Sequence, residues 1–170
     1  MGPSVIVVMG VSGSGKTTVA SLLAERLHWQ FAEADSFHPA ANVARMRDGI
    51  PLTDEDRWPW LDAIAAWIDS ARASGQRCVI TCSALKRAYR ERIIHGHHDV
   101  RFVYLKGEYG LVARRVAARK GHYMPVALLQ SQFDTLEEPG PGERPLAVSI
   151  EPPPESIVAG IVTALGLETR

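Results

Sequence analysis

The sequence has little cysteine, no net charge and no long apolar run. Its 170 residues hold two cysteines, and nineteen basic residues balance nineteen acidic ones. A neutral chain offers no electrostatic attraction to nucleic acid or to a membrane surface, so neither is expected as a partner. No apolar run approaches the roughly 20 residues of a membrane-spanning helix, and the N-terminus lacks the order of a secretory signal peptide. The length predicts one domain with a substantial core.

Cysteine and asparagine usage excludes two further possibilities. Cys78 and Cys82 lie four positions apart on one apolar run, which in a strand separates them by about 13 Å, too far for a disulfide. We therefore expect buried thiols and a reducing, cytoplasmic setting. The single asparagine, Asn42, is followed by Val43, so the Asn-Lys-x-Asp pattern that reads guanine in GTP switches is missing.

A glycine-rich loop is the most informative feature that is present. Residues 10–17 read G-V-S-G-S-G-K-T directly after the apolar run Val5–Met9, which is the context that a phosphate-binding loop requires. Backbone N–H groups of such a turn form an anion nest, and a helix starting near Lys16 adds its positive dipole. A flexible Gly/Ser turn is the alternative, and the complete motif disfavours it. The residues predicted to hold a nucleoside triphosphate are Gly10, Ser12, Gly13, Ser14, Gly15, Lys16, Thr17 and Thr18.

Apolar, β-branched runs alternate with helical patterns along the whole chain. The expected strands are Val5–Met9, Phe31–Ala34, Cys78–Cys82, Val100–Leu105 and Leu146–Ile150. The expected helices begin near Lys16, cover Ala40–Arg47, follow Asp56 as an N-cap, and then cover Lys86–Ile94, Tyr109–Arg119, Val126–Leu136 and Glu155–Leu165. This alternation predicts a single α/β domain over residues 1–170, with helices on both faces of a parallel sheet.

Open α/β sheets bind ligands at the carboxyl ends of their strands, so polar residues there are candidates for chemistry. Asp35 follows the second strand and could accept a proton from an attacking hydroxyl or orient Mg²⁺; an N-cap or Asx turn is the alternative. His38 could donate to substrate oxygens or pack as a turn histidine. Arg45, near a helix end, could clamp a carboxylate or be merely solvated there.

The third strand ends in T-C-S-A-L-K at residues 81–86 and carries no acid. The Mg²⁺-orienting aspartate of many phosphate-loop ATPases is therefore missing there, which increases the weight on Asp35. Ser83, Lys86 and Arg90 offer a hydroxyl and two cations to an acceptor. For Arg90, pairing with Glu91 on a solvated helix face is the alternative.

The helix predicted after the fourth strand ends in a basic stretch. Arg115 and Arg119 lie four apart, so a helix would carry both on one face. In small kinases this region forms a mobile lid whose arginines neutralise charge on the transferring phosphoryl group, and the expected lid covers residues 115–130. A basic helix end that satisfies its own dipole is the alternative. The histidine-rich stretch 95–99 reads as a solvated loop at the opposite end of the sheet.

Taken together, several blocks make the sequence similar to gluconokinases of the small phosphate-loop type. They are G-V-S-G-S-G-K-T, D-S-F-H-P (35–39), the stretch 49–61, C-S-A-L-K-R-A-Y-R (82–90), R-K-G-H-Y-M (119–124) and S-Q-F (131–133). The resemblance covers nearly the whole chain. One departure is that many members carry a second acid or glycine around Asp35, where this chain has Ala34 and Ser36.

The resemblance implies ATP- and Mg²⁺-dependent phosphorylation of D-gluconate at its terminal hydroxyl, giving 6-phospho-D-gluconate. It also implies a three-layer kinase fold with strand order 2-3-1-4-5 and a small lid, and a homodimer. The catalytic candidates are Lys16, Asp35 and Arg119, with Arg115 added to the nucleotide set and Thr17 and Asp35 as metal ligands. The substrate candidates are Asp35, His38, Arg45, Ser83, Lys86, Arg90, His122 and Gln132. The competing interpretations are another small-molecule kinase, such as shikimate kinase, and a regulatory module that binds ATP without turnover.

Overall fold

The computed structural model describes residues 2–119 and 126–167. Its strands are β1 (Val5–Met9), β2 (Gln30–Glu33), β3 (Cys78–Thr81), β4 (Val100–Lys106) and β5 (Leu146–Ser149). Its α-helices are α1 (Lys16–Leu27), α2 (Ala40–Arg47), α3 (Asp54–Ala73), α4 (Arg87–Ile94), α5 (Tyr109–Ala118), α6 (Val126–Thr135) and α7 (Pro154–Leu165), with short 3₁₀ helices η1 (Ala34–Phe37) and η2 (Pro141–Glu143). The strands are all parallel in the order β2-β3-β1-β4-β5, which confirms the predicted sheet.

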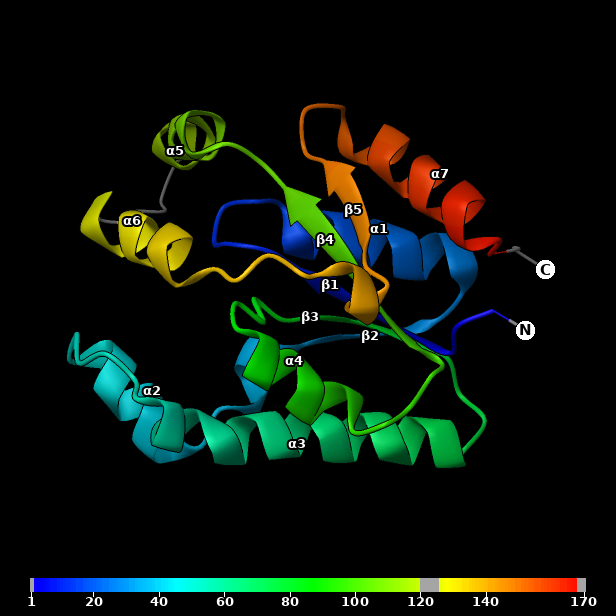
Figure 1. The fold of residues 1–170 in the computed structure, drawn as a ribbon, viewed down its shortest axis with the longest axis horizontal. Helices are drawn as coiled ribbons and strands as arrows, with labels where there is room; N and C mark the ends of the chain where they lie inside the picture. The colour runs from blue at the N-terminus through cyan, green and yellow to red at the C-terminus, as the bar shows by residue number, and fades with distance from the viewer. Residues whose placement is uncertain (1, 120–125, 168–170) are drawn as a thin grey trace.

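Helices cover both faces of the sheet, with α1 and α7 on one side and α3 and α4 on the other (Figure 1). The central strand β1 shows why its sequence is a continuous apolar run. Ile6 and Val8 pack into the core cluster that contains α1 and α7, while Val5, Val7 and Met9 pack into the cluster that contains α3 and α4. All five side chains are fully buried, because successive residues of a strand point to opposite faces and both faces are covered.

The carboxyl ends of the strands point toward α2, α5 and α6, which lie beyond that edge of the sheet (Figure 1). Both cysteines are buried free thiols, as expected. One detail of the prediction is wrong: the N-cap of α3 is Thr53, and Asp56 is the third helical residue. Thr53 Oγ1 accepts from the N–H of Asp56, whose carboxylate accepts from the N–H of Thr53 at 2.9 Å. This reciprocal capping box was readable from the T-x-x-D spacing.

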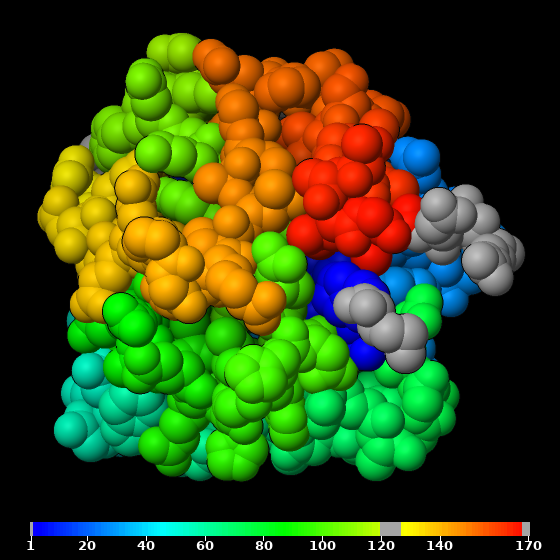
Figure 2. Space-filling model, turned by 45° about the vertical axis from the view of Figure 1, so that its right-hand side comes forward, coloured from blue at the N-terminus to red at the C-terminus, as the bar shows by residue number. Residues whose placement is uncertain are grey.

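A buried ion pair joins α4 to the segment before β5. Arg90 Nε lies 2.7 Å from Glu143 Oε1, and the two side chains are 1% and 8% exposed. Arg90 also donates to the carbonyl of Ala84 at 2.7 Å. Figure 2 shows the stretch 136–145 (orange) lying against the green surface of α4. We therefore correct both expectations for Arg90: its donors are committed inside the protein, and its partner is Glu143 and not Glu91, which pairs with Arg87 at 3.0 Å.

Glu143→Gln is expected to lower the free energy of unfolding by about 3–5 kcal/mol, because it leaves the Arg90 charge buried without a counter-charge. Burial raises the pKa of Glu143, but hydrogen bonds from Arg90 and the Gly140 N–H outweigh it, so the net pKa lies below its usual value. Urea unfolding measures the loss. The matched control is Glu91→Gln, which removes an exposed pair worth about 0.5 kcal/mol or less. Equal effects of the two substitutions would contradict a special role for the buried pair.

Candidate active site

The phosphate loop leaves β1 at Gly10 and enters α1 at Lys16, in conformations that only glycine tolerates. Gly13 has φ +84°, and a Cβ placed there would lie 2.4 Å from Val116 of α5. At Gly10 a Cβ would lie 2.8 Å from Ser14 Oγ, whose hydroxyl is buried beneath the loop. Close packing on both sides therefore fixes the curvature of the loop and turns its backbone donors inward.

Within the described residues, some backbone N–H groups of the loop are bonded and others have no acceptor. Ser14 N–H bonds to the carbonyl of Val11 at 3.2 Å, and Ser12 N–H to Gln132 Oε1 at 2.7 Å. Within residues 2–119 and 126–167, no acceptor takes the N–H groups of Gly13, Gly15, Lys16, Thr17 and Thr18. A row of free N–H groups at a helix N-terminus is an anion-binding site. Residues 13 and 15–18 offer such groups, whereas the N–H groups of Gly10, Ser12 and Ser14 are bonded to Ser83, Gln132 and Val11.

Lys16 is the half-buried cation beside these N–H groups. Its Nζ lies 3.0 Å from the carbonyl oxygens of both Gly10 and Val11, so the side chain folds back along the loop. Burial lowers the pKa of the Lys16 ammonium to about 8, against the opposing charge of the Asp35 carboxylate. Asp35 is among the charges that act on the Lys16 ammonium, and its position opposite the phosphate loop stays a prediction. A phosphate would supply the anionic partner that the ammonium lacks.

Triphosphate binding is accordingly expected to take up a proton at alkaline pH. The free protein loses the Lys16 proton as pH rises through about 8, whereas bound phosphate would hold the ammonium charged. The affinity for ATP should therefore fall by up to about tenfold per pH unit above that value. Calorimetry at pH 8.5 in two buffers of different ionisation enthalpy measures the uptake, and Lys16→Met should abolish it. No difference between the buffers would contradict the lowered pKa.

The second strand delivers Asp35 and His38 to the same edge. Asp35 lies in η1 and is exposed, with its carboxylate free to meet a ligand. The ring of His38 stacks on Trp60 at a centroid distance of 4.2 Å, and its Nδ1 lies 3.2 Å from the amide nitrogen of Asn42. Burial lowers the pKa of His38, although the charge of Asp35 opposes the shift. The histidine is thus both packed and adjacent to Asp35.

A polar cluster around Asp54 includes residues to which the sequence assigned no role. Lys86 Nζ lies 3.3 Å from both oxygens of Asp54, the Tyr89 hydroxyl donates to the same carboxylate, and Arg57 Nη1 lies 3.9 Å away. The Tyr89 hydrogen bond is the main reason that the pKa of Asp54 lies below its usual range. Because the Arg57 charge also acts on His38, this cluster adjoins Asp35. The sequence did not point to Arg57 or Tyr89, because an arginine on a helix and a buried tyrosine both have common structural roles.

The other acceptor-side candidates occupy different environments. Arg45, near the end of α2, is paired with Asp56. Ser83 follows β3 and is half-buried, and its carbonyl receives the N–H of Gly10 at 3.4 Å. Lys86 is the N-cap of α4, beside the Asp54 cluster. Ser83 and Lys86 therefore sit next to the loop and the acceptor side, whereas Arg45 lies on the outer helix.

The arginines after β4 do not share a helical face. Helix α5 ends at Ala118, and Arg119 is its C-cap with extended backbone angles, φ −77° and ψ 119°. Arg119 is exposed, while Arg115 donates to the carbonyl of Ile150 at 2.6 Å. The expected face failed because the helix stops one residue too early. His122 lies outside the described residues, and the assignment of residues 115–130 as a lid stays a prediction.

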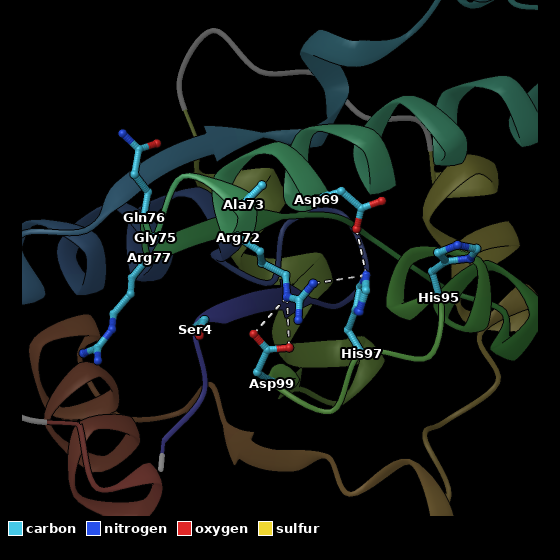
Figure 3. A pocket seen from close by; sticks show the side chains of 10 residues that line it. All are labelled: Ser4, Asp69, Arg72, Ala73, Gly75, Gln76, Arg77, His95, His97 and Asp99. Carbon is cyan, nitrogen blue, oxygen red and sulfur yellow. Dashed lines mark hydrogen bonds and ion pairs between the residues drawn. The ribbon is translucent and has the colours of Figure 1, made fainter.

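At the opposite edge of the sheet, the histidine-rich stretch builds a different feature. A cavity of about 600 Å³ opens there, and His97 lies between Asp69 and Arg72, at 2.8 and 3.3 Å (Figure 3). Arg72 also holds Asp99 with two hydrogen bonds. The side chains of His95, Gln76 and Arg77 point away from this network (Figure 3). These hydrogen bonds join the C-terminal end of α3 to the residues that precede β4, at the edge of the sheet opposite the phosphate loop.

Two absences hold for the described residues 2–119 and 126–167. No three histidine, cysteine, aspartate or glutamate side chains are grouped so that they could hold a metal ion. In this part of the chain, none of the helices is both long enough and apolar enough to cross a membrane.

A five-stranded parallel sheet in the order β2-β3-β1-β4-β5, whose central strand leads through a glycine loop into a helix, defines a phosphate-loop kinase fold. Residues 5–139 match the family described as AAA domain. A gluconokinase from Gluconobacter oxydans is 47% identical over 160 residues, covering 94% of this chain and 90% of that protein. The thermoresistant gluconokinase of Escherichia coli is 41% identical over 162 residues, covering 95% and 93%. The chain belongs to the gluconokinase family.

Solved structures agree with this assignment. A gluconokinase from Sinorhizobium meliloti superposes with a TM-score of 0.87 at 44% identity, covering 96% of this chain and 92% of that one. A shikimate kinase from Aquifex aeolicus, at 19% identity and a TM-score of 0.59, shares the fold alone. The sequence relationship therefore favours gluconokinase over another small-molecule kinase such as shikimate kinase.

Proposed function

We propose that this protein transfers the terminal phosphoryl group of ATP to the terminal hydroxyl of D-gluconate, giving 6-phospho-D-gluconate. The observation that carries the proposal is the row of N–H groups at the start of α1 that have no acceptor within the described residues, with the half-buried Lys16 ammonium beside them. The choice of gluconate as the substrate rests on relatives that are named gluconokinase and match nearly the whole chain. A sugar acid carries one carboxylate and many hydroxyls, which suits the mixed polar side chains on the acceptor side.

In the proposed in-line transfer, the loop N–H groups and Lys16 hold the β- and γ-phosphates of ATP. Lys16 leaves the Gly10 and Val11 carbonyls to follow the negative charge as it develops on the transferring group. Asp35 orients the attacking hydroxyl and accepts its proton. Arg119, with Arg115, is proposed to act on the charge of the phosphoryl group from the end of α5.

The donor set also suits Mg²⁺. Thr17 is the second residue of α1 and is exposed, and Asp35 in η1 is exposed as well. A hydroxyl and a carboxylate are the hard oxygen ligands that Mg²⁺ takes together with phosphate oxygens and water. When bound, the ion would neutralise charge on the phosphates. The two residues proposed to hold it are Thr17 and Asp35.

Among the acceptor-side cations, Lys86 is the one we propose for the gluconate carboxylate, with Arg57 beside it. Both already surround a carboxylate, that of Asp54, so the cluster has the charge and spacing that such a group needs. His38 and Ser83 are proposed to contact the hydroxyls. Arg45, in the last turn of α2 and paired with Asp56 of α3, is proposed as a more distant contact of the gluconate.

A coupled assay that measures ADP release as a function of gluconate tests the proposal. Gluconate should stimulate ADP release strongly, whereas shikimate, adenosine monophosphate and nucleosides should not. ATP binding without any acceptor-stimulated turnover would instead indicate a regulatory module. Activity on shikimate but not on gluconate would overturn the substrate.

We also propose a homodimer in the cytoplasm, on the strength of the family resemblance. Both cysteines are free and buried, and free thiols suit a reducing compartment. Light scattering at micromolar concentration measures the oligomeric state directly. A monomeric mass across that range would overturn the dimer.

A further inference from the structure

Glu137, which follows helix α6, holds both of the peptide groups that flank Lys86. Its backbone N–H donates to the carbonyl of Leu85 at 2.7 Å, and its Oε1 accepts the N–H of Arg87 at 3.0 Å. The Leu85 carbonyl belongs to the peptide before Lys86, and the Arg87 N–H belongs to the peptide after it. Because peptides are planar, φ and ψ of Lys86 are the only free backbone rotations between these two groups. Glu137 therefore sets the direction in which the Lys86 side chain leaves the backbone.

Helix α4 receives its N-terminal cap from this contact. Its N-cap residue is Lys86, with φ −105° and ψ 146°, whose side chain makes no capping hydrogen bond, and the first turn holds no acid. Lysine carries donors only, so it cannot accept from the N–H groups of the first turn. A carboxylate there gains both a hydrogen bond and a favourable interaction with the helix dipole. Glu137 supplies it from 50 residues away in the sequence.

The turn before Lys86 is strained and is held through its carbonyl groups. Ala84 has φ +47°, a left-handed conformation that non-glycine residues keep only where surrounding contacts enforce it. The carbonyls of residues 83–85 accept in turn from the phosphate loop at 3.4 Å, from buried Arg90 at 2.7 Å and from Glu137 at 2.7 Å. Because the turn depends on these contacts, weakening the hold of Glu137 should displace Lys86.

The placement of Lys86 matters because its ammonium lies on the acceptor side. Its Nζ is 3.3 Å from both carboxylate oxygens of Asp54, and its long stem has many rotamers, so the position of the charge depends on the backbone that carries it. We propose that Glu137 is a positioning residue for the acceptor, which holds the two peptides around Lys86 so that the ammonium meets the carboxylate of gluconate. This inference rests on the proposed function, which takes Lys86 as the contact of that carboxylate.

Two substitutions separate the hydrogen bond of Glu137 from its charge. Glu137→Ala removes both and leaves the backbone bond to Leu85. Glu137→Gln removes the charge but keeps an oxygen that can accept the Arg87 N–H. The matched control is Glu91→Ala, which takes an exposed acid from α4 itself. The Glu91 carboxylate pairs with the side chain of Arg87 at 3.0 Å and not with its backbone.

Steady-state kinetics with gluconate and ATP varied in turn gives the readout. For Glu137→Ala we expect the KM for gluconate to rise about 3- to 30-fold, the range that the loss of a helix cap contributes to an equilibrium constant. The kcat should stay within about threefold and the KM for ATP within about twofold, because the gluconate carboxylate is remote from the hydroxyl that reacts. Glu137→Gln and Glu91→Ala should keep the wild-type KM. An unchanged KM in Glu137→Ala, or an equal rise in Glu137→Gln, would overturn the proposal.

A double-mutant cycle tests whether Glu137 acts through Lys86. In a Lys86→Met background the ammonium is gone, so adding Glu137→Ala should raise the KM for gluconate by less than about twofold. A merely structural contribution of Glu137 would instead multiply the effect of Lys86→Met. Independent effects of the two substitutions would therefore contradict a positioning role.

Failure of the proposed function is distinguishable from failure of this inference. It would appear in the wild-type protein, as absent gluconate-dependent ADP release. The hold on Lys86 can be measured without turnover, as hydrogen exchange of the Arg87 amide, which should be at least ~5-fold faster in Glu137→Ala than in the wild type or in Glu137→Gln. Equal exchange in all three proteins would show that Glu137 does not hold this peptide.

Discussion

Asp35→Asn is expected to lower kcat for gluconate phosphorylation by about 10²- to 10⁴-fold, the range contributed by a positioned general base. The amide keeps the shape of the side chain but can neither take the proton of the attacking hydroxyl nor offer a charged oxygen to Mg²⁺. Folding should be unaffected because Asp35 is exposed in η1. Steady-state kinetics with gluconate varied at saturating ATP measures the effect.

The matched control for this substitution is Asp69→Asn. Asp69 is another half-exposed carboxylate beside a histidine, at the opposite edge of the sheet, and its loss should leave kcat unchanged. The two roles of Asp35 separate by Mg²⁺ dependence. If raising the Mg²⁺ concentration restores the rate of Asp35→Asn, the carboxylate acts as a metal ligand and not as the base. A kcat equal to that of the wild type would refute both roles.

Lys16→Met is the second large effect. We expect kcat to fall by about 10²- to 10³-fold, because the variant lacks the cation that follows charge on the transferring phosphoryl group. The free energy of unfolding should not fall. Burial lowers the pKa of Lys16 to about 8, which means that the folded state disfavours the charged ammonium relative to the unfolded state. Thermal unfolding and turnover of the same preparation therefore give opposite expectations.

Lys106→Met provides the comparison. Lys106 ends β4, is exposed and pairs with Glu138 at 3.5 Å, so it has the same side chain at the same edge of the sheet without a place in the nest. Its replacement should leave kcat within about threefold of the wild-type value, as expected for an exposed surface ion pair. A large loss of stability in Lys16→Met would show that the lysine supports the fold, contrary to its lowered pKa.

The sequence predicted features that depend on local pattern. The glycine loop, the strands and their covering helices follow from residues that are neighbours in the chain. Except at the start of α3, which lies three positions earlier than predicted, the observed boundaries are within one or two positions of the prediction. The strand order came with the family resemblance, because alternating elements predict a parallel sheet but not which strands are adjacent. Thr53 was a local signal that was overlooked in favour of Asp56.

Long-range partners were not predictable from pattern. Arg90 stands on a helix next to Glu91, and local spacing favours that pair, yet Glu143 lies 53 residues away and in the same buried layer. Gln132 and Ser12 are separated by 120 residues. A periodic pattern states which face of an element is buried, but packing of the whole chain decides what lies opposite. The acceptor-side residues Arg57 and Tyr89 were missed for this reason.

The position of β1 in the sheet determines when this protein acquires its ligand site during synthesis. Among the five described strands, β1, which carries the phosphate loop, is synthesised before its neighbours β3 and β4, at residues 78–81 and 100–106. Parallel strands separated this far in sequence pair late and slowly. The loop is therefore synthesised well before the strands that hold it in shape, and nucleotide can stabilise the fold only after β4 has been made.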